Sequence, residues 1–292
     1  MRDMEILCRA SAFLVRSKNP QFRHRYHILT ASHVVAPWRF PNYYPDEWLQ
    51  FVNEKHTHYT VELRHDDGVF MTQSELLPSA VHHASRDLAV LHLENESAVK
   101  DLLSNVGFEV ADLRDAQLVT GEAVDLHGHE VVVPSSFGTG SSSSGGSGDA
   151  DARHPIPRVV SGTYELETAH QRFARTKSLL TYGMCGGPVI ARAGSGGGRR
   201  NDGNTDGSSV GAVCGLLEGI VPVDHPVREL QGLASIVDSR QIAAFLEDVE
   251  AGADALAAKG HVALVGGEAA LHVGSDQDPE KSLDSLLRKF DD

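Results

Sequence analysis

The chain has 292 residues, 41% of them hydrophobic, and its 26 Lys and Arg against 40 Asp and Glu leave a net charge of −14. This length is enough for one large domain or two small ones with a substantial core. The negative charge argues against nucleic acid as a partner, and no apolar run approaches the roughly 20 residues of a membrane span.

The start of the chain and its cysteines bear on location. Asp3 and Glu5 argue against a mitochondrial presequence, and a strand-like run that already begins near residue 11 leaves no room for a signal peptide. The chain has three cysteines, Cys8, Cys185 and Cys214. An odd, small number fits a reducing compartment better than a disulfide framework. We therefore expect an intracellular protein, with the cytoplasm as the default and an organelle left open.

Short strand-like runs separated by turn signals dominate the chain. They lie at residues 11–16, 26–29, 59–64, 89–93, 123–126, 131–133, 158–160, 188–191, 210–217 and 232–236. Many short strands with little helical periodicity predict an all-β protein of barrel type. We expect a first barrel over about 5–110 and a second over about 118–238, joined by a crossing segment at 101–115.

Two segments of the first half carry candidate catalytic side chains. The apolar run Tyr26–Leu29 leads into Thr-Ala-Ser-His-Val-Val, which contains His33. Further on, Asp87 opens the strand-like sequence Asp-Leu-Ala-Val-Leu. A histidine transfers protons near neutral pH, and a carboxylate on its second ring nitrogen fixes the tautomer.

An aromatic segment, residues 38–59, follows the histidine directly. It holds seven of the eighteen aromatic residues of the chain, both tryptophans included. Large aromatics on a loop can anchor a protein partner or border a substrate cleft. The alternative is a small local core that covers the end of the barrel, and the sequence leaves both open.

The most informative segment is the turn Thr-Tyr-Gly-Met-Cys-Gly-Gly-Pro-Val at 181–189, which contains Gly183, Cys185, Gly186 and Gly187. Glycines let backbone N–H groups converge on one point because no Cβ blocks the approach. Beside a nucleophile, such donors form an oxyanion hole. A thiolate is the attacking form of cysteine, and a histidine in contact with the thiol can accept its proton.

Taken together, the three segments resemble those of trypsin- and chymotrypsin-like peptidases, with the Deg/HtrA pattern and a cysteine at the nucleophile position. The order His33, Asp87, Cys185 is the chymotrypsin order. The resemblance implies two six-stranded antiparallel barrels with C-terminal helices and an active site between them. The first barrel would span 5–115, and the second, with its closing helix, 116–250.

The resemblance also implies roles for these residues. His33 would be the general base, Asp87 its orienting carboxylate and Cys185 the nucleophile, with the N–H groups of Gly183 and Cys185 as oxyanion hole. The Gly-x-Cys-Gly-Gly turn is similar to that of picornavirus processing proteases, so cysteine need not mean an inactive site. Met184 stands where chymotrypsin-type zymogens have an aspartate, so we expect no zymogen activation of that kind.

The substrate pocket is implied only by resemblance. It would be bordered by Leu179 and by the strand that consists of Val213, Cys214, Gly215 and Leu216. No acid stands near Leu179, so a basic P1 residue is disfavoured and a neutral, apolar or small one is expected. Cys214 would lie near the buried aspartate, either as packing or as a redox partner of Cys185.

The C-terminal part predicts helices. Residues 239–256 form the expected closing helix, and 251–292 form an acidic tail with a short helix at about 280–290. Its apolar stripe is Leu283, Leu286, Leu287 and Phe290. This helix and the aromatic segment are the two candidate sites for a protein partner. The Ser/Gly-rich runs 135–152 and 194–209 are expected to be surface loops.

We expect no cofactor and no metal. His56 and His58, His127 and His129, and the adjacent His82 and His83 are the histidine patterns of the chain. A structural zinc site would also need cysteine or carboxylate ligands at suitable spacing, which the sequence does not offer.

Three functional readings remain at this stage. The first is an endopeptidase that hydrolyses peptide bonds through an acyl-enzyme on a Cys-His-Asp triad. The second is an inactive pseudo-protease that keeps the fold as a binding or scaffold module in a larger complex. The third is an acyl transferase that uses the same residues without proteolysis. The intact triad favours an enzyme, whereas the cysteine, the insertions and the aromatic segment favour a scaffold.

Overall fold

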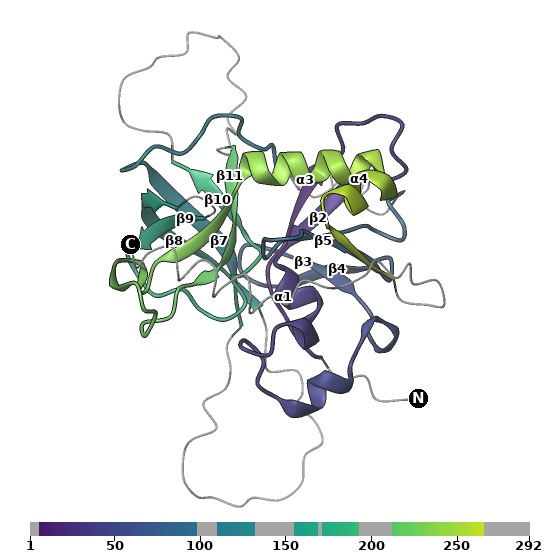
Figure 1. The fold of residues 1–292 in the computed structure, drawn as a ribbon, viewed down its shortest axis with the longest axis horizontal. Helices are drawn as coiled ribbons and strands as arrows, with labels where there is room; N and C mark the ends of the chain where they lie inside the picture. Colours follow the sequence, from purple (N-terminus) through teal and green to yellow (C-terminus); the bar gives the residue numbers. More distant parts are fainter. Residues whose placement is uncertain (1–5, 98–109, 132–154, 169–170, 193–211, 266–292) are drawn as a thin grey trace, which may run out of the picture.

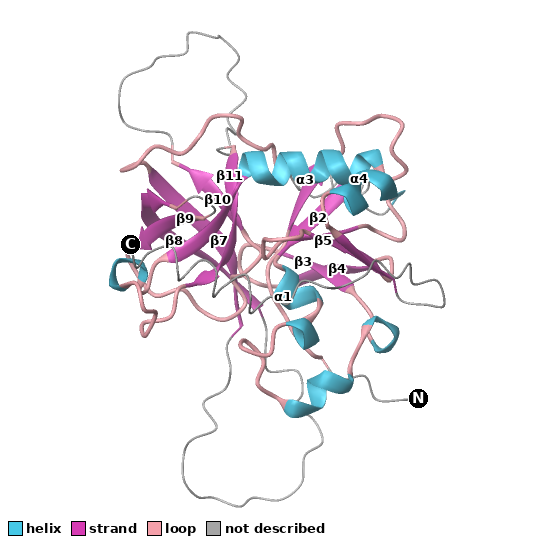
Figure 2. Cartoon of the chain, in the orientation of Figure 1, coloured by secondary structure: helices cyan, strands magenta, loops and turns pink. Residues whose placement is uncertain are grey.

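The computed structural model describes residues 6–97, 110–131, 155–168, 171–192 and 212–265. The described chain is mostly strand, in two units that lie side by side (Figures 1 and 2). The helical segments are α1 (Ser32–Val35), η1 (Pro37–Arg39), η2 (Glu47–Phe51), η3 (Glu54–His56), η5 (Arg228–Leu230), α3 (Ser239–Ala251) and α4 (Ala253–Ala258). None of the helices in the described ranges is long and apolar enough to cross a membrane.

The first unit is built on a five-stranded antiparallel sheet in the order β1-β2-β6-β5-β13. Its strands are β1 (Phe13–Arg16), β2 (Tyr26–Thr30), β5 (Ser79–His82), β6 (Ala89–Leu91) and β13 (Val262–Val265). A separate hairpin consists of β3 (Thr60–Arg64) and β4 (Phe70–Glu75). One face of the sheet and the hairpin enclose a core that includes Leu14, Tyr26, Ile28, Leu76 and Leu91.

The second unit is a closed six-stranded barrel in the order β10-β11-β12-β9-β8-β7. Its strands are β7 (Ala123–Val131), β8 (Pro155–Glu167), β9 (Arg172–Thr176), β10 (Pro188–Ala191), β11 (Val213–Ile220) and β12 (Ala234–Asp238). Side chains that point inward fill the barrel, among them Val124, Leu126, Tyr164, Met184 and Leu217. The expected all-β double-barrel class is thus confirmed, with the first unit as an open sheet plus hairpin.

A third core joins the two units under α3, which lies across both of them (Figure 1). Apolar side chains of α3 pack against β1 and β2 of the first unit and against β11 and β12 of the second; they include Ile242, Phe245, Leu246 and Val249. Because β11 faces the barrel core on one side and this shared core on the other, its residues from Val213 to Glu218 are all buried. The two units are therefore held in a fixed relation by burial rather than by the connecting segment alone.

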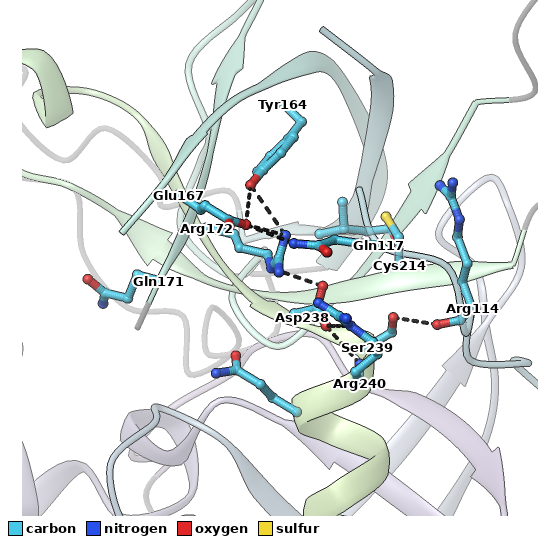
Figure 3. Close-up of polar contacts among 12 residues, drawn as sticks. Arg114, Gln117, Tyr164, Glu167, Gln171, Arg172, Cys214, Asp238, Ser239 and Arg240 are labelled. Carbon is cyan, nitrogen blue, oxygen red and sulfur yellow. Dashed lines mark hydrogen bonds and ion pairs between the residues drawn. The ribbon is translucent and has the colours of Figure 1, made fainter. Parts of the chain in front are cut away.

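Both ends of α3 have clear physical causes. Asp238 caps the start: its carboxylate accepts a hydrogen bond from the Arg240 amide at 2.9 Å and pairs with the Arg172 guanidinium at 2.9 Å (Figure 3). Gly252, with φ of 97°, ends the helix before α4. The single helix expected at 239–256 is therefore two helices. A cavity of about 340 Å³ lies at the start of α3, beside Asp238 and Arg172, and none of its lining residues belongs to the predicted triad.

After α4 the chain returns to the first unit, where β13 pairs with β5 from Val262↔His82 to Val265↔Ser79. The part of the expected tail up to Val265 is therefore helix and strand of the folded protein. The short terminal helix at 280–290, with Leu283, Leu286, Leu287 and Phe290, lies outside the described residues. So do the runs 135–152 and 194–209 and most of the crossing segment.

Candidate active site

The imidazole of His33 is fixed by Asp87. The one-turn helix α1 begins directly after β2 and carries His33, while Asp87 lies in the turn between β5 and β6. The Asp87 carboxylate accepts a hydrogen bond from the His33 amide at 2.9 Å and bonds the ring Nδ1 at 2.5 Å. His33 is only 4% exposed. Both carboxylate oxygens thus hold one histidine, with its Nε2 turned the other way.

On that other side the ring interacts with Cys185. Burial alone would lower the pKa of His33, but hydrogen bonds to Asp87 and to the Cys185 sulfur, together with the charges of both, raise it to about 9. The structure therefore brings the three predicted residues together, with His33 between Asp87 and Cys185. A histidine with a raised pKa beside a thiol is placed to accept the proton of that thiol.

The nucleophile turn is shaped by glycines in backbone conformations that other residues rarely adopt. Gly183 has φ of 96° and Gly186 has φ of 85°. A Cβ on Gly186 would lie 2.2 Å from the Thr30 hydroxyl oxygen and 2.3 Å from the Ser11 carbonyl oxygen, both in the first unit. A Cβ on Gly187 would lie 2.0 Å from the His127 carbonyl oxygen. These glycines let the turn approach the first unit closely enough for Cys185 to reach His33.

The N–H groups proposed for the oxyanion hole are available. The carbonyl of Tyr182 accepts a hydrogen bond from the Val131 amide at 2.9 Å, and the carbonyl of Met184 accepts one from the Gly187 amide at 3.1 Å. In a trans peptide the N–H points opposite to the C=O, so the N–H groups of Gly183 and Cys185 face away from those donors. Neither N–H has an acceptor among the described residues.

Ser11, which the sequence analysis missed, ties the turn to both units. Its hydroxyl donates to the Gly183 carbonyl at 2.7 Å and accepts from the His129 amide at 2.7 Å. Its amide donates to the Cys185 carbonyl at 3.0 Å, and its carbonyl accepts from the Thr30 hydroxyl at 2.8 Å. A serine two residues before the first strand carries no sequence signal of this kind, because its partners are remote in the chain.

The structure corrects the predicted pocket strand. Val213, Cys214 and Leu216 are at most 2% exposed, and Gly215 lies between them; they fill the cores on either side of β11 and cannot line a pocket. The Cys214 thiol donates to the Val189 carbonyl at 3.1 Å, and burial raises its pKa to about 12. Cys214 is therefore packing, not a redox partner of Cys185.

The residue of β11 that lies beside the predicted triad is Glu218, four residues after Cys214. Its carboxylate is 5% exposed and accepts a hydrogen bond from the Asp87 amide at 3.3 Å. Leu217, just before it, bonds the nucleophile turn through the Gly186 amide at 2.8 Å and the Gly187 carbonyl at 3.0 Å. The end of β11, not its beginning, therefore lies beside the candidate active site. Leu179, also predicted for the pocket, is 83% exposed.

The aromatic segment divides between the two roles left open. Tyr43 stacks on the His33 ring with a centroid distance of 4.8 Å and an interplanar angle of 7°. The Tyr44 hydroxyl bonds the Cys8 sulfur at 3.0 Å. Tyr59 packs against the core of the first unit, whereas Phe51 is 75% exposed. Part of the segment is thus a local core, and part covers one face of the His33 imidazole.

The histidine patterns do not form a metal centre in the described part of the chain, where no group of three or more metal-ligating side chains comes together. His58 pairs with Glu75 instead. The hydroxyl of Ser32 donates to the Leu88 carbonyl at 2.8 Å and hydrogen-bonds the buried His82 at 2.9 Å. These contacts are structural, and His82 steadies the helix that carries His33.

Three comparisons relate the chain to known proteins. Residues 10–196, well over half of the chain, match the family model of the trypsin-like peptidase domain. A search of curated proteins found no match.

Solved structures with a similar arrangement are proteases of low sequence identity. The HtrA-type protease AlgW with a decapeptide is 14% identical, with a TM-score of 0.41 over 82% of this chain and 64% of that chain. Rv3671c from M. tuberculosis H37Rv, in an inactive form, is 13% identical, with a TM-score of 0.41 over 83% and 82%. The thermostable serine protease AL20 from an extremophilic microorganism is 12% identical, with a TM-score of 0.48 over 84% and 91%. The chain spans less than two thirds of the AlgW chain. On the family match, this chain belongs to the trypsin-like peptidase domain family.

Proposed function

We propose that this protein is an intracellular endopeptidase that cleaves peptide bonds with a Cys-His-Asp triad formed by Cys185, His33 and Asp87. The observation that carries the proposal is the position of the His33 ring, which bonds Asp87 through Nδ1 at 2.5 Å and lies close enough to Cys185 for that residue to raise the pKa of the ring. Membership in a peptidase family supports peptide hydrolysis as the reaction.

Acylation begins with transfer of the Cys185 proton to Nε2 of His33. The thiolate attacks the carbonyl carbon of the scissile bond, and a tetrahedral intermediate forms with its negative charge on the former carbonyl oxygen. His33 then gives its proton to the leaving amine, and the acyl group remains on sulfur. Asp87 keeps the protonated ring in place throughout, because both of its oxygens are engaged with His33.

Deacylation uses the same groups with water as the nucleophile. His33 takes a proton from water, the hydroxide attacks the thioester, and the thiolate leaves as the acid product departs. The N–H groups of Gly183 and Cys185 stabilise the oxyanion in both halves of the reaction. Each such donor contributes about 3 kcal/mol to transition-state stabilisation in proteases.

The substrate proposed is a peptide segment without a basic residue at the cleavage position. Two of the exposed side chains near the turn are apolar or aromatic, with Tyr182 85% exposed and Leu179 83%. The other two, Lys177 and Ser178, carry no negative charge that would attract a basic residue. Ile220 at the end of β11 is also exposed. An apolar or small P1 side chain would meet these surfaces without leaving a charge unpaired.

The chemistry of the site supports the proposed intracellular location. All three cysteines are free thiols, and Cys185 must stay reduced to act as a nucleophile. A reducing compartment preserves it.

A second candidate function is that of a binding module without proteolysis. The observation in its favour is Tyr43, which stacks on the open face of the catalytic imidazole and thereby covers part of the site. In this alternative the same surface, residues 38–59, would hold a protein partner rather than a substrate.

The deciding experiment is the pH dependence of alkylation at Cys185, read by mass spectrometry beside Cys8 and Cys214 in the same digest. Cys214 serves as the internal control because its thiol is buried. We expect rapid labelling of Cys185 well below the ordinary thiol pKa of about 8.5 and its loss in His33→Ala. Labelling of Cys185 that follows an ordinary thiol and ignores His33→Ala would refute the enzyme proposal and leave the binding module.

A further inference from the structure

A buried carboxylate of the second unit, that of Glu218, contacts the backbone of Asp87. Glu218 lies near the end of β11, and its Oε1 accepts the hydrogen bond of the Asp87 amide at 3.3 Å. Its Oε2 accepts a hydrogen bond from the hydroxyl of Ser235 on β12 at 2.5 Å. Ser235 is 7% exposed, so this pair is enclosed. A buried carboxylate costs free energy unless its oxygens are satisfied, and here both of them are.

The surroundings of Glu218 connect three elements. The neighbouring Arg86 is buried, its charge acts on Glu218, and its guanidinium donates to the Gln241 side chain of α3 at 3.2 Å. The charged or titratable groups that face Glu218 are Arg86 and Asp87 from the β5–β6 turn and Tyr43 from the aromatic segment. The turn that carries Asp87 is therefore attached to β11 by Glu218 and to α3 by Arg86.

We infer that Glu218 is a positioning residue of the triad: it holds the Asp87 backbone so that the Asp87 carboxylate meets both His33 donors. The carboxylate of Asp87 is fully occupied by the His33 amide and Nδ1. Nothing in that pair itself fixes Asp87 relative to the second unit, which carries Cys185. The bond from the Asp87 amide to Glu218 supplies that link. This inference rests on the proposed use of the three residues as a triad.

Three substitutions separate the hydrogen bond from the charge. Glu218→Gln keeps an oxygen that accepts from the Asp87 amide and loses the charge, whereas Glu218→Ala loses both. Ser235→Ala removes one support of the Glu218 carboxylate. Glu122→Gln is the matched control, because its carboxylate lies in the same barrel and bonds Arg114 and the Val119 amide instead.

The first readout is the rate of Cys185 alkylation as a function of pH. For Glu218→Ala we expect a fall of about tenfold near pH 6, the size of one lost hydrogen-bond contribution. Glu218→Gln and Glu122→Gln should stay within about threefold of the parent protein, and Ser235→Ala should fall between. A folded Glu218→Ala protein with the parent alkylation profile overturns the inference, and so does a Gln variant as slow as the Ala variant.

The second readout does not depend on catalysis. The proton between His33 Nδ1 and Asp87 should give a low-field resonance in the proton NMR spectrum, because the bond is short and enclosed. We expect Glu218→Ala to move or broaden this resonance and Glu122→Gln to leave it unchanged. If Glu218→Ala does not fold, the comparison of Glu218→Gln with Glu218→Gln plus Ser235→Ala replaces it, and an unmoved resonance in that double variant overturns the inference. One outcome separates this inference from the proposed function. If Cys185 of the parent protein is alkylated like an ordinary thiol but the resonance responds to Glu218→Ala, the proposed function is refuted and the positioning role of Glu218 remains.

Discussion

The second unit closes its six strands into a barrel, whereas the first unit is an open five-stranded sheet whose outer strand comes from far along the chain. The barrel of the second unit is built from residues 123–238 alone, mostly from strands that follow one another. The first unit needs β13, which pairs with β5 across about 180 residues (from 82 to 262). The first unit supplies His33 and Asp87 and the second supplies Cys185, so the more self-contained unit carries the predicted nucleophile.

The units also differ in which polar side chains they bury. The first unit encloses His27, His33, His82 and His92, all at most 6% exposed. Among its described residues the second unit buries no histidine, but it encloses the side chains of Glu218, Ser235 and Asp238. This contrast teaches that acid should destabilise the first unit, in which burial lowers the pKa of His82 and His92, more than the second.

The largest effect should come from the contact between the units. Gly186→Ala would place a Cβ against Thr30 and Ser11 at φ of 85°. We expect a loss of about 4 kcal/mol of unfolding free energy, from overpacking and backbone strain together. Urea unfolding followed by circular dichroism would measure it.

Gly121→Ala is the control for this substitution. Gly121 has nearly the same φ, 89°, but no atom within 4 Å of the added Cβ. It should cost only about 1 kcal/mol. Equal losses in the two variants would mean that the close approach of the units is not what requires glycine at 186.

The second largest effect should be a loss of stability of the first unit at acid pH. Burial lowers the pKa of His82 and of His92 to about 3, from about 6.5 in the unfolded chain. Their contribution to stability is complete above pH 6.5 and is lost as the pH falls from 6.5 towards 3. At pH 5 this amounts to about 2 kcal/mol for each histidine. His33 acts in the opposite sense, because its raised pKa stabilises the fold below pH 6.5 and that contribution is lost as the pH rises through about 9.

The chain provides its own probe for the acid effect. Both tryptophans, Trp38 and Trp48, lie in the aromatic segment of the first unit. Tryptophan fluorescence therefore reports the first unit, and far-ultraviolet circular dichroism reports both. In urea at pH 5 we expect the fluorescence midpoint to drop well below its value at pH 7. A midpoint that is the same at both pH values would contradict the contrast drawn between the units.

The smallest effect concerns Tyr43. Removal of its ring in Tyr43→Ala should uncover His33 and increase the alkylation rate of Cys185 about threefold, with little change in stability because the side chain is 56% exposed. Trp48→Ala, which removes an exposed ring of the same segment, should leave the rate unchanged. If both variants label at the parent rate, Tyr43 does not limit access to the site.

The triad was predictable because each of its members stands in a short local motif. His33 follows an apolar run, Asp87 opens one, and Cys185 lies among glycines whose conformations leave few alternatives. The structure brings these three together, although their catalytic roles stay a prediction. The strands β4, β5, β9 and β13 were missed, because runs of four to six residues such as Val262–Val265 become strands only through their partners in the fold.

The pocket strand was misplaced for a related reason. Val-Cys-Gly-Leu-Leu along β11 is buried on both faces, so the sequence there has no alternation that would set which residue lies beside Asp87. Glu218 indicates the part of β11 beside Asp87 better than the apolar run does, since a charged residue in a buried strand needs a polar partner. Ser11 gave no such signal, because its four hydrogen bonds arise only when both units are in place.

The position of β13 also bears on biosynthesis. Along the described chain it is the last strand to be made, 80 residues after Cys185 (from 185 to 265). At about 5–20 residues per second, translation needs roughly 4–16 s for this interval. All three reactive side chains therefore leave the ribosome before the sheet that holds two of them can be completed. Any alignment of His33, Asp87 and Cys185 that depends on the complete sheet can therefore form only after residue 265 has been made.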